Sequence, residues 1–352
     1  MNNLNKIIKK ITANERIDIN EGLALFRQAD LLTLASLANQ KRFYVHPDKM
    51  VTYVVDRNIN YTNICASGCR FCAFFEAPDT GCGYIISKQD LSDKIQETLD
   101  LGGTQILLQG GMHPDLDIDY YIDLLTYIKA GFDIHIHGFS PPEIDFIAKK
   151  SSLSIKKTLQ VLKNAGLSSI PGGGAEILCD DVRKKVSPNK CSSEEWLEVM
   201  RQAHLLGMSS SATMMFGHVE KDHHILAHMD KLRTLQDETH GFTAFIPWTF
   251  QPDNTKILVK KKTAVEYLRV LAMSRLFFDN IDNIQASWVT QGDKIAQTAL
   301  FFGANDMGST MIEENVVASA GVDFMLSREE LTRLITTAGF EPRQRDCYYH
   351  LL

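Results

Sequence analysis

The pattern of hydrophobic positions changes along the chain from helical spacing to a strand and helix alternation. From Asp18 to Arg42 apolar residues recur at helical spacing, and Asp30 falls where an N-cap would begin a helix partway along. From Val51 to about residue 310, short apolar runs alternate with longer amphipathic segments. We expect strands at Ile59–Asn63, Thr104–Gln109, Asp133–His137, Ser168–Ile170, Ser210–Phe216, Thr243–Trp248, Asn283–Ala286 and, more weakly, near Asp306. We expect helices at Gln89–Leu101, Tyr120–Lys129, Ile155–Asn164, Ser193–Leu206, His223–Glu238, Ala264–Asp279 and Lys294–Leu300.

This alternation predicts an α/β fold. Repeated strand and helix units imply a parallel sheet that is buried on both faces, and eight units favour a closed (βα)8 barrel of the TIM type. Glycines at the expected helix ends support the boundaries, because the residue after a helix often adopts a left-handed conformation. We therefore divide the chain into an N-terminal helical segment (1–50), a barrel core (51–310) and a C-terminal extension packed on the barrel (311–352).

Polar and glycine-rich segments follow the expected strands. The carboxyl ends of parallel strands share one rim of a barrel, and active sites are built there. His135 and His137 alternate along one expected strand, so both lie on the same side of it. An apolar wall for an aromatic ring is expected from Met214, Met215, Phe245, Trp248, Phe250 and Trp288, although most such residues belong to a core.

Composition and charge narrow the choice of partners. With 44% hydrophobic and 23% charged residues in 352 positions, the chain matches an ordinary globular protein. Its net charge of -6 provides no electrostatic footprint for nucleic acid. No apolar run reaches the roughly 20 residues that span a bilayer, and the polar N-terminus lacks the apolar centre of a secretory signal. We expect a cytoplasmic protein with no nucleic-acid or membrane partner.

Three of the seven cysteines, Cys65, Cys69 and Cys72, form a Cys-x3-Cys-x2-Cys cluster directly after the first expected strand. This crowding favours metal ligation in a reducing compartment over a disulfide framework. Three thiolates can hold a 4Fe-4S cluster with one open iron, whereas a purely electron-carrying cluster needs a fourth cysteine at a family spacing. A zinc site or a noncatalytic iron-sulfur module stays an alternative, and Cys82 or His113 could then supply a fourth ligand.

At this spacing, with Phe71 before the last cysteine, the sequence resembles the radical S-adenosylmethionine enzymes. From about residue 21 to the C-terminus it also resembles the cyclic dehypoxanthine futalosine synthases of the futalosine route to menaquinone. The matching segments are 56–63, 72–74, 102–111, 135–143, 171–178, 212–220, 245–252 and 286–292.

The resemblance implies a 4Fe-4S cluster and S-adenosyl-L-methionine as cofactors. In that family a 5′-deoxyadenosyl radical removes hydrogen from the ribose 4′ carbon of dehypoxanthine futalosine, and the carbon radical adds to the substrate's own benzoate ring. A small electron donor such as flavodoxin or ferredoxin is implied as the partner.

Several residues are carried over by position as cofactor contacts. They are Phe71 against the adenine, Gln109, Gly110 and Gly111 against the methionyl amino group, Ser140, Glu176 against ribose or amino donors, and Arg183 against the carboxylate. The alternative for the two glycines is only a tight turn, and the alternative for Arg183 is a solvated helix residue.

The implied reaction needs a base for the proton that leaves the ring. Candidates at the expected rim are Asp293, which begins a helix, His218, which follows the fifth strand, and Asp306 at the weak eighth strand. Asp293 can also be a helix cap, and His218 a rim histidine. A dry lumen capped by the N-terminal helices would protect the radical from solvent.

One departure from the family pattern follows the last cysteine. Phe75-Glu76 stand where the family has Tyr-Arg after Cys-Ala-Phe, so any cofactor or substrate role of that arginine is unassigned here. The nearest rivals are aminofutalosine synthase and related deazaflavin or thiazole enzymes with a similar cysteine loop. The Gln109-Gly110-Gly111 segment and residues 212–216 favour the cyclase by resemblance.

Overall fold

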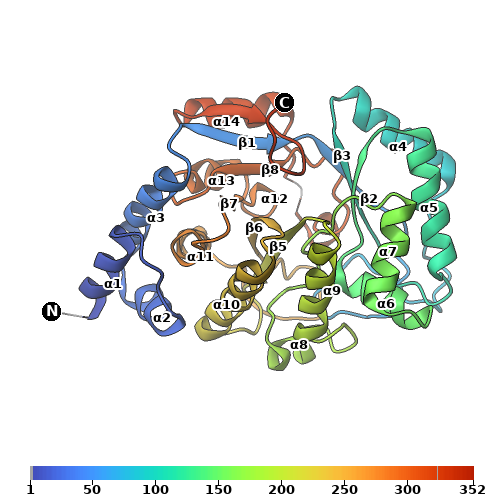
Figure 1. Cartoon of the computed structure of the whole chain (residues 1–352), viewed down its shortest axis with the longest axis horizontal. Helices are drawn as coiled ribbons and strands as arrows, with labels where there is room; N and C mark the ends of the chain where they lie inside the picture. Colours follow the sequence, from blue (N-terminus) through green and yellow to red (C-terminus); the bar gives the residue numbers. More distant parts are fainter. Residues whose placement is uncertain (1–2, 323) are drawn as a thin grey trace.

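Helices surround a set of parallel strands (Figure 1). The computed structural model describes residues 3–322 and 324–352. The strands are β1 (Met50–Val54), β2 (Asp56–Asn60), β3 (Gln105–Gln109), β4 (His135–Gly138), β5 (Ser210–Phe216), β6 (Phe242–Thr249), β7 (Asn283–Ile284), β8 (Asp306–Ser309) and β9 (Glu341–Gln344). The helices are α1 (Asn3–Thr12), α2 (Ile19–Gln28), α3 (Leu31–Val45), α4 (Lys88–Asp100), α5 (Ile118–Gly131), α6 (Pro141–Lys150), α7 (Ile155–Ala165), α8 (Asp180–Val186), α9 (Ser193–Leu205), α10 (Asp222–Thr239), α11 (Ala264–Phe277), α12 (Trp288–Gln291), α13 (Asp293–Ala299), the 3-10 helix η1 (Ala318–Ala320) and α14 (Arg328–Thr337).

The barrel closes through parallel pairs. β2 pairs with β3 and β3 with β4, while β5 pairs with β6 and β6 with β7. Single bridges continue the ring from His137 to Ser169, from Ile170 to Ser210 and from Gln285 to Asp306. β8 pairs with β1, and the chain runs on from β1 into β2, which completes the ring. The predicted (βα)8 barrel is confirmed.

The first strand differs from its prediction. We expected Ile59–Asn63, but the strand occupies residues 50–60 with a break at Val55, and residues 61–63 belong to the following loop. The pattern of apolar positions does not predict the second half of this strand, because its buried residues Asp56, Arg57 and Asn58 are polar. The Gln105 amide donates to the Asp56 carboxylate at 2.6 Å between neighbouring strands.

The N-terminal helices pack on the outside of the barrel. Asp18 and Asp30 cap α2 and α3, which confirms the N-cap expected at Asp30. α2 packs against α10, and α3 against α11, with Gly22 fitted between Leu226 and Phe277. The prediction that these helices cap the lumen is therefore wrong, since α10 and α11 themselves cover the outside of the strands (Figure 1).

The C-terminal segment enters the barrel. β9 pairs in parallel with β1, and the chain beyond it places Arg345, Cys347 and Tyr349 among the residues that line the lumen. Arg345 donates from Nε to one Asp306 oxygen at 2.6 Å and from Nη2 to the other at 3.0 Å. The segment expected to pack on the barrel thus also supplies part of its inner wall.

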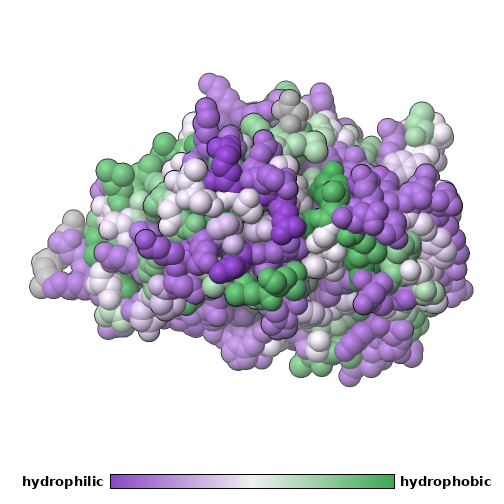
Figure 2. Space-filling model, turned by 90° about the horizontal axis from the view of Figure 1, so that it is seen from above, coloured by the Kyte–Doolittle hydropathy of each residue, from purple (hydrophilic) through white to green (hydrophobic). Residues whose placement is uncertain are grey.

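Hydrophilic side chains predominate on the face seen from above, and hydrophobic ones form separate patches there (Figure 2). Across residues 3–322 and 324–352, no helix has the length and apolar character needed to cross a membrane.

Candidate active site

The three clustered cysteines lie in the loop that follows β2, at the carboxyl end of the barrel. Cys69 is buried, and Cys65 and Cys72 are half-buried. The Met112 backbone N–H donates to Cys65 Sγ at 3.3 Å, and Ser67 Oγ lies 3.1 Å from Cys69 Sγ. Burial raises the pKa of the Cys69 and Cys72 thiols. Donors next to sulfur are the contacts that stabilise bound thiolates, so the loop suits a thiolate-held cluster.

The separation of these sulfur atoms distinguishes zinc from a larger cluster. A tetrahedral zinc with Zn–S bonds of about 2.3 Å holds its sulfurs about 3.8 Å apart. Among the residues that the structure describes, the sulfur atoms of Cys65, Cys69 and Cys72 do not all lie within 4.8 Å of one another. None of these three cysteines belongs to a group of three or more His, Cys, Asp or Glu ligand atoms that are this close together. Cys82 is exposed and pairs with the Thr80 carbonyl. The donor set therefore fits a cluster better than a closed zinc site.

Two glycines after β3 let the cysteine loop approach the barrel. A Cβ on Gly111 would lie 2.1 Å from the Ile64 carbonyl oxygen, and a Cβ on Gly110 would lie 2.6 Å from the Tyr61 ring. These contacts require glycine whether or not a cofactor binds there. The predicted cofactor contact of Gly110 and Gly111 stays a prediction.

The Glu143 carboxylate accepts hydrogen bonds from several donors near the Gly110–Gly111 turn. Its carboxylate accepts from Tyr61 Oη at 2.8 Å, from the Gly110 N–H at 3.0 Å and from the Ser140 N–H at 2.8 Å. The Ser140 hydroxyl also donates to Glu143, so it begins α6 with an internal bond. Ser140 is therefore oriented by Glu143, while Gln109 reaches the lumen as a lining residue.

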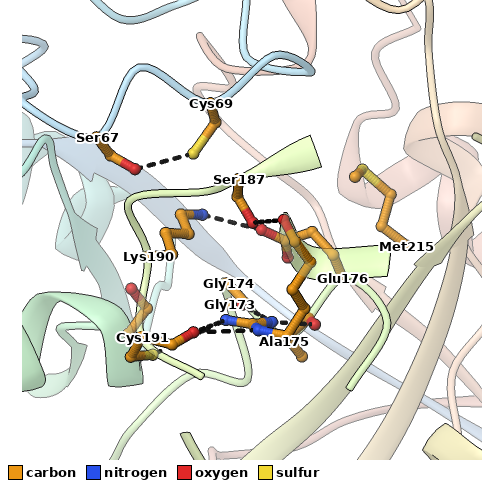
Figure 3. A network of polar contacts seen from close by, with 12 residues as sticks. Ser67, Cys69, Gly173, Gly174, Ala175, Glu176, Ser187, Lys190, Cys191 and Met215 are labelled. Atoms are coloured by element: carbon orange, nitrogen blue, oxygen red, sulfur yellow. Dashed lines mark hydrogen bonds and ion pairs between the residues drawn. The ribbon is translucent and has the colours of Figure 1, made fainter. Parts of the chain in front are cut away.

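An ion pair between half-buried Lys190 and buried Glu176 lies beside Cys69 (Figure 3). Lys190 Nζ is 2.9 Å from Glu176 Oε1 and 5.0 Å from the centre of the Phe71 ring. Burial alone would lower the pKa of Lys190, but Cys69 and Glu176 raise it overall, so it stays charged. Burial would raise the pKa of Glu176, yet Lys190 and Arg183 lower it overall. The pair places one cation and one anion next to the cysteine loop.

The structure corrects the role of Arg183. This side chain is 2% exposed, and it donates to the carbonyls of Gly174 at 3.1 Å, Ala175 at 2.7 Å and Cys191 at 2.7 Å. With these bonds it cannot also form a bidentate fork with a cofactor carboxylate, so that prediction is wrong. Arg183 instead holds the two chain segments that carry Glu176 and Lys190. Nothing in the sequence pointed to Lys190, because a half-buried lysine and a surface lysine look alike in a polar loop.

Asp306 is not available as a base. It is fully buried, and besides both Arg345 bonds it accepts from the Thr52 hydroxyl at 2.5 Å and from the Gly308 N–H at 2.7 Å. A carboxylate with this set of donors anchors structure. The predicted catalytic role of Asp306 is therefore replaced by a structural one.

The other two predicted bases lie apart from the lumen. His218 Nε2 is 3.0 Å from the Met215 carbonyl, and its Nδ1 accepts from the Val219 N–H at 2.8 Å. Burial lowers the pKa of His218. Asp293 is the first residue of α13. Neither His218 nor Asp293 is among the residues that line the lumen cavity. The catalytic roles of His218 and Asp293 stay predictions, and their places outside the cavity lining do not support these roles.

A cavity of about 280 Å³ occupies the barrel lumen. Trp248 and Trp288 provide aromatic surface, as expected, whereas Met214 and Phe245 point to the outer core. The polar or ionisable residues around the cavity include Asp56, Asn58, Gln105, Gln109, His137, Ser211, Glu314, Arg345 and Tyr349. An apolar cavity with a few convergent polar groups is typical of a small-molecule site.

His135 and His137 share one partner, which confirms that they lie on the same side of β4. The ring nitrogens His135 Nε2 and His137 Nδ1 are each 2.6 Å from Ser169 Oγ, and Cys347 Sγ is 3.4 Å from the same oxygen. His137 Nε2 is 3.3 Å from Ser211 Oγ. Burial lowers the pKa of His137 to about 3, so this lumen histidine is neutral.

The fold and the cysteine loop agree with comparisons to known families. The family model described as the Radical SAM superfamily matches residues 59–232, and the CofH/MqnC C-terminal region matches residues 239–352. The chain therefore belongs to the radical SAM superfamily.

Within that superfamily the chain is 44% identical over 348 residues to the cyclic dehypoxanthine futalosine synthase of Halalkalibacterium halodurans, covering 98% of this chain and 94% of that protein. It is 42% identical to the synthase of the same name from Streptomyces coelicolor, covering 99% and 89%. It is also 40% identical to the 5-amino-6-(D-ribitylamino)uracil–L-tyrosine 4-hydroxyphenyl transferase of Methanocaldococcus jannaschii, covering 99% and 98%.

Solved structures share the fold at lower identity. The FeFe-hydrogenase maturase HydG from Carboxydothermus hydrogenoformans has a TM-score of 0.77 at 16% identity, covering 98% of this chain and 80% of that one. Methylornithine synthase has a TM-score of 0.72 at 17% identity, covering 96% and 97%.

Proposed function

We propose that this chain is a radical S-adenosylmethionine cyclase that converts dehypoxanthine futalosine to cyclic dehypoxanthine futalosine in menaquinone biosynthesis. The observation that carries the proposal is the three-thiol loop at the carboxyl end of a closed barrel with a cavity in its lumen. The choice of substrate rests on the two synthases at 44% and 42% identity.

In this proposal Cys65, Cys69 and Cys72 hold one 4Fe-4S cluster, and Lys190 and Glu176 bind polar groups of S-adenosylmethionine. When bound, this pair of cofactors supplies the 5′-deoxyadenosyl radical and so the removal of a hydrogen atom from the substrate. The Lys190 ammonium suits the cofactor carboxylate, and the Glu176 carboxylate suits hydroxyl or amino donors. Phe71 lies beside Lys190, with its ring face toward the ammonium.

The lumen would fold the substrate and exclude water. The rings of Trp248 and Trp288 suit the flat benzoate group. Holding the ribose and the ring in one enclosed space converts their bond formation into a reaction between preoriented groups. Water would compete for the reactive carbon, so the buried wall also protects the chemistry.

His137 is the proton acceptor in this proposal. It lines the cavity and is neutral, so its lone pair can take the proton that leaves the benzoate ring, while the one electron that must leave with it would return to the oxidised cluster. The Ser169 hydroxyl, which contacts both His137 and His135, orients the ring and can pass the charge toward the second histidine. This assignment takes the place of Asp306 and is favoured over His218 and Asp293 by position.

A second candidate function comes from the archaeal relatives, which are 38% to 42% identical over 85% to 99% of this chain. Their name describes transfer of a 4-hydroxyphenyl group from L-tyrosine to 5-amino-6-(D-ribitylamino)uracil. Both functions would use the same cysteine loop, so they differ only in what the lumen binds.

The test is anaerobic reconstitution with iron and sulfide, followed by incubation with S-adenosylmethionine, dithionite and either substrate set. We expect 5′-deoxyadenosine and, from dehypoxanthine futalosine, a product two hydrogen atoms lighter, detected by mass spectrometry. Product from L-tyrosine and the aminouracil in its place would refute the cyclase assignment. The His137→Gln variant should still form 5′-deoxyadenosine but lose the cyclised product, and an unchanged product yield would remove His137 as the base.

A further inference from the structure

Three chain segments meet at Arg70, the residue that follows Cys69 in the cysteine loop. The Arg70 N–H donates to the Val186 carbonyl at 2.9 Å, and the Arg70 carbonyl accepts from the Lys256 N–H at 2.8 Å. Arg70 Nη1 lies 3.4 Å from the Lys185 carbonyl oxygen. The end of α8 and the loop between β6 and α11 are therefore tied directly to the loop of the three thiols.

These segments carry exposed basic side chains, which we name the basic face: Arg70, Lys184, Lys185, Lys256 and Lys260. Neighbouring Lys261 and Lys262 form ion pairs with Asp253 and Glu266, at 2.8 and 2.7 Å. Within residues 3–322 and 324–352, none of the five residues of the basic face has an acidic partner within ion-pair distance. A chain with a net charge of -6 thus presents uncompensated positive charge next to its cysteine loop.

An exposed apolar residue accompanies this charge. Leu258, between Lys256 and Lys260, is 95% exposed. On the same stretch, Lys256 Nζ lies 5.8 Å from the centre of the Phe75 ring, which connects the loop to the segment after Cys72. A charged rim around an apolar contact is the usual anatomy of a protein–protein interface.

We propose that the basic face docks an acidic one-electron carrier protein, which delivers electrons to the cluster held by the adjacent thiols. In each encounter the carrier loses one electron and the cluster gains one, with no bond made or broken. This inference rests on the proposed function, since an electron is needed there only if the thiols hold a redox-active cluster. Opposite charges would speed the encounter and orient the carrier toward Cys69 and Cys72.

The basic face fits a protein carrier rather than a small reductant, because its positive charge is spread over three chain segments. A small chemical reductant needs no such surface and reaches the cluster by diffusion. Comparing a protein carrier with a small reductant therefore distinguishes an effect on docking from an effect on the later chemistry. Dithionite should therefore support turnover equally well when the basic face is altered.

The test uses the Lys185→Glu/Lys256→Glu double variant of the full chain, with a purified, acidic bacterial flavodoxin as the probe. Neither lysine has a place in the proposed cofactor site. The matched control is Lys49→Glu/Arg333→Glu, which makes the same change in net charge. Both control residues are exposed, and Lys49 directly precedes β1, at the opposite end of the barrel from the cysteine loop.

The first measurement is flavodoxin binding to the full chain by titration calorimetry at low and high salt. We expect the Lys185/Lys256 variant to bind about tenfold more weakly at low ionic strength, with a smaller difference in about 0.5 M salt. The control variant should bind as the unaltered protein does. Equal binding by the two variants would overturn the proposal, as would binding of the unaltered protein that does not change with salt.

The second measurement compares 5′-deoxyadenosine formation by the reconstituted proteins with reduced flavodoxin and with dithionite. We expect the Lys185/Lys256 variant to lose rate only with flavodoxin. Equal loss with both reductants would contradict docking and indicate damage to the cluster site. Absence of cyclised product with dithionite in the unaltered protein would refute the proposed function, while the calorimetric result decides the docking surface independently.

Discussion

Replacement of Arg345 by methionine should destabilise the barrel strongly, because it leaves the Asp306 carboxylate buried without its cation. Asp306 is fully buried, and its two oxygens accept from Arg345 Nε at 2.6 Å and Nη2 at 3.0 Å. Removing one partner of such a buried pair costs about 3–5 kcal/mol. That is a large part of the roughly 5–15 kcal/mol that separates folded from unfolded states in typical proteins.

Arg343 is the matched control, because it lies two residues earlier on β9 and forms an exposed pair with Glu341. Exposed ion pairs contribute about 0–1 kcal/mol, so Arg343→Met should change the free energy of unfolding by less than about 1 kcal/mol. Urea denaturation, followed by tryptophan fluorescence, measures both variants.

The Arg345→Met/Asp306→Asn double variant completes the comparison. With the carboxylate neutralised, the uncompensated charge is gone, and we expect a substantial part of the lost stability to return. The reasoning is refuted if Arg345→Met costs no more than Arg343→Met. It is also refuted if the effects of the two substitutions at Arg345 and Asp306 simply add.

Three further predictions concern the cysteine loop and the buried histidines. Gly111→Ala should lower bound iron well below that of Gly131→Ala after reconstitution, because a Cβ at Gly111 would lie 2.1 Å from a loop carbonyl whereas Gly131 has nothing within 4 Å; equal iron contents would contradict this. Lys190→Met should weaken S-adenosylmethionine binding about tenfold or more while keeping the iron content, since a charged hydrogen bond contributes about 1.5–3 kcal/mol; unchanged affinity in equilibrium dialysis would remove Lys190 from the site. Burial lowers the pKa of His228 to about 3, so in acid the unfolded chain binds a proton that the folded chain does not, and stability falls as the pH drops below about 6.5. His228→Gln should therefore reduce the loss of unfolding free energy between pH 7 and 5.5 by about 1 kcal/mol. An identical pH profile for the variant and the unaltered protein would refute this.

The barrel could be predicted because its helices and outer strand faces carry ordinary periodic patterns. Short apolar runs marked most strands, and the weak eighth strand at Asp306 was found where expected. β2 was misplaced because Asp56, Arg57 and Asn58 are buried polar residues in a strand, whereas β1 was missed although Met50–Val54 is a mostly apolar run. A local pattern of polar residues predicts a turn, but the partners of these residues lie far along the chain: Gln105 and Ser309 for Asp56, Glu97 on α4 for Arg57, and Glu314 for Asn58.

The cysteine loop could be predicted from spacing alone, but its surroundings could not. Lys190, for which the sequence predicts no role, pairs with Glu176, whereas Arg183 binds backbone carbonyls, because which cation faces Glu176 depends on how the segment from 174 to 191 folds back on itself. His137 was recognised only as one of two histidines on the same side of a strand. Its place in the lumen depends on β4 pairing with β3 and on contact with Ser169.

The strand that crosses the seam of the barrel has a consequence for the order of folding. β1 pairs with β8 through Thr52 and Asp306 and with β9 through Met50 and Glu341, so both of its neighbours come from the far end of the chain. Closing loops of this length carries an entropic cost that must be met before the pairing stabilises anything. β1 is therefore among the last strands to be secured, and its backbone groups stay open to incorrect pairing until residues 341–344 arrive.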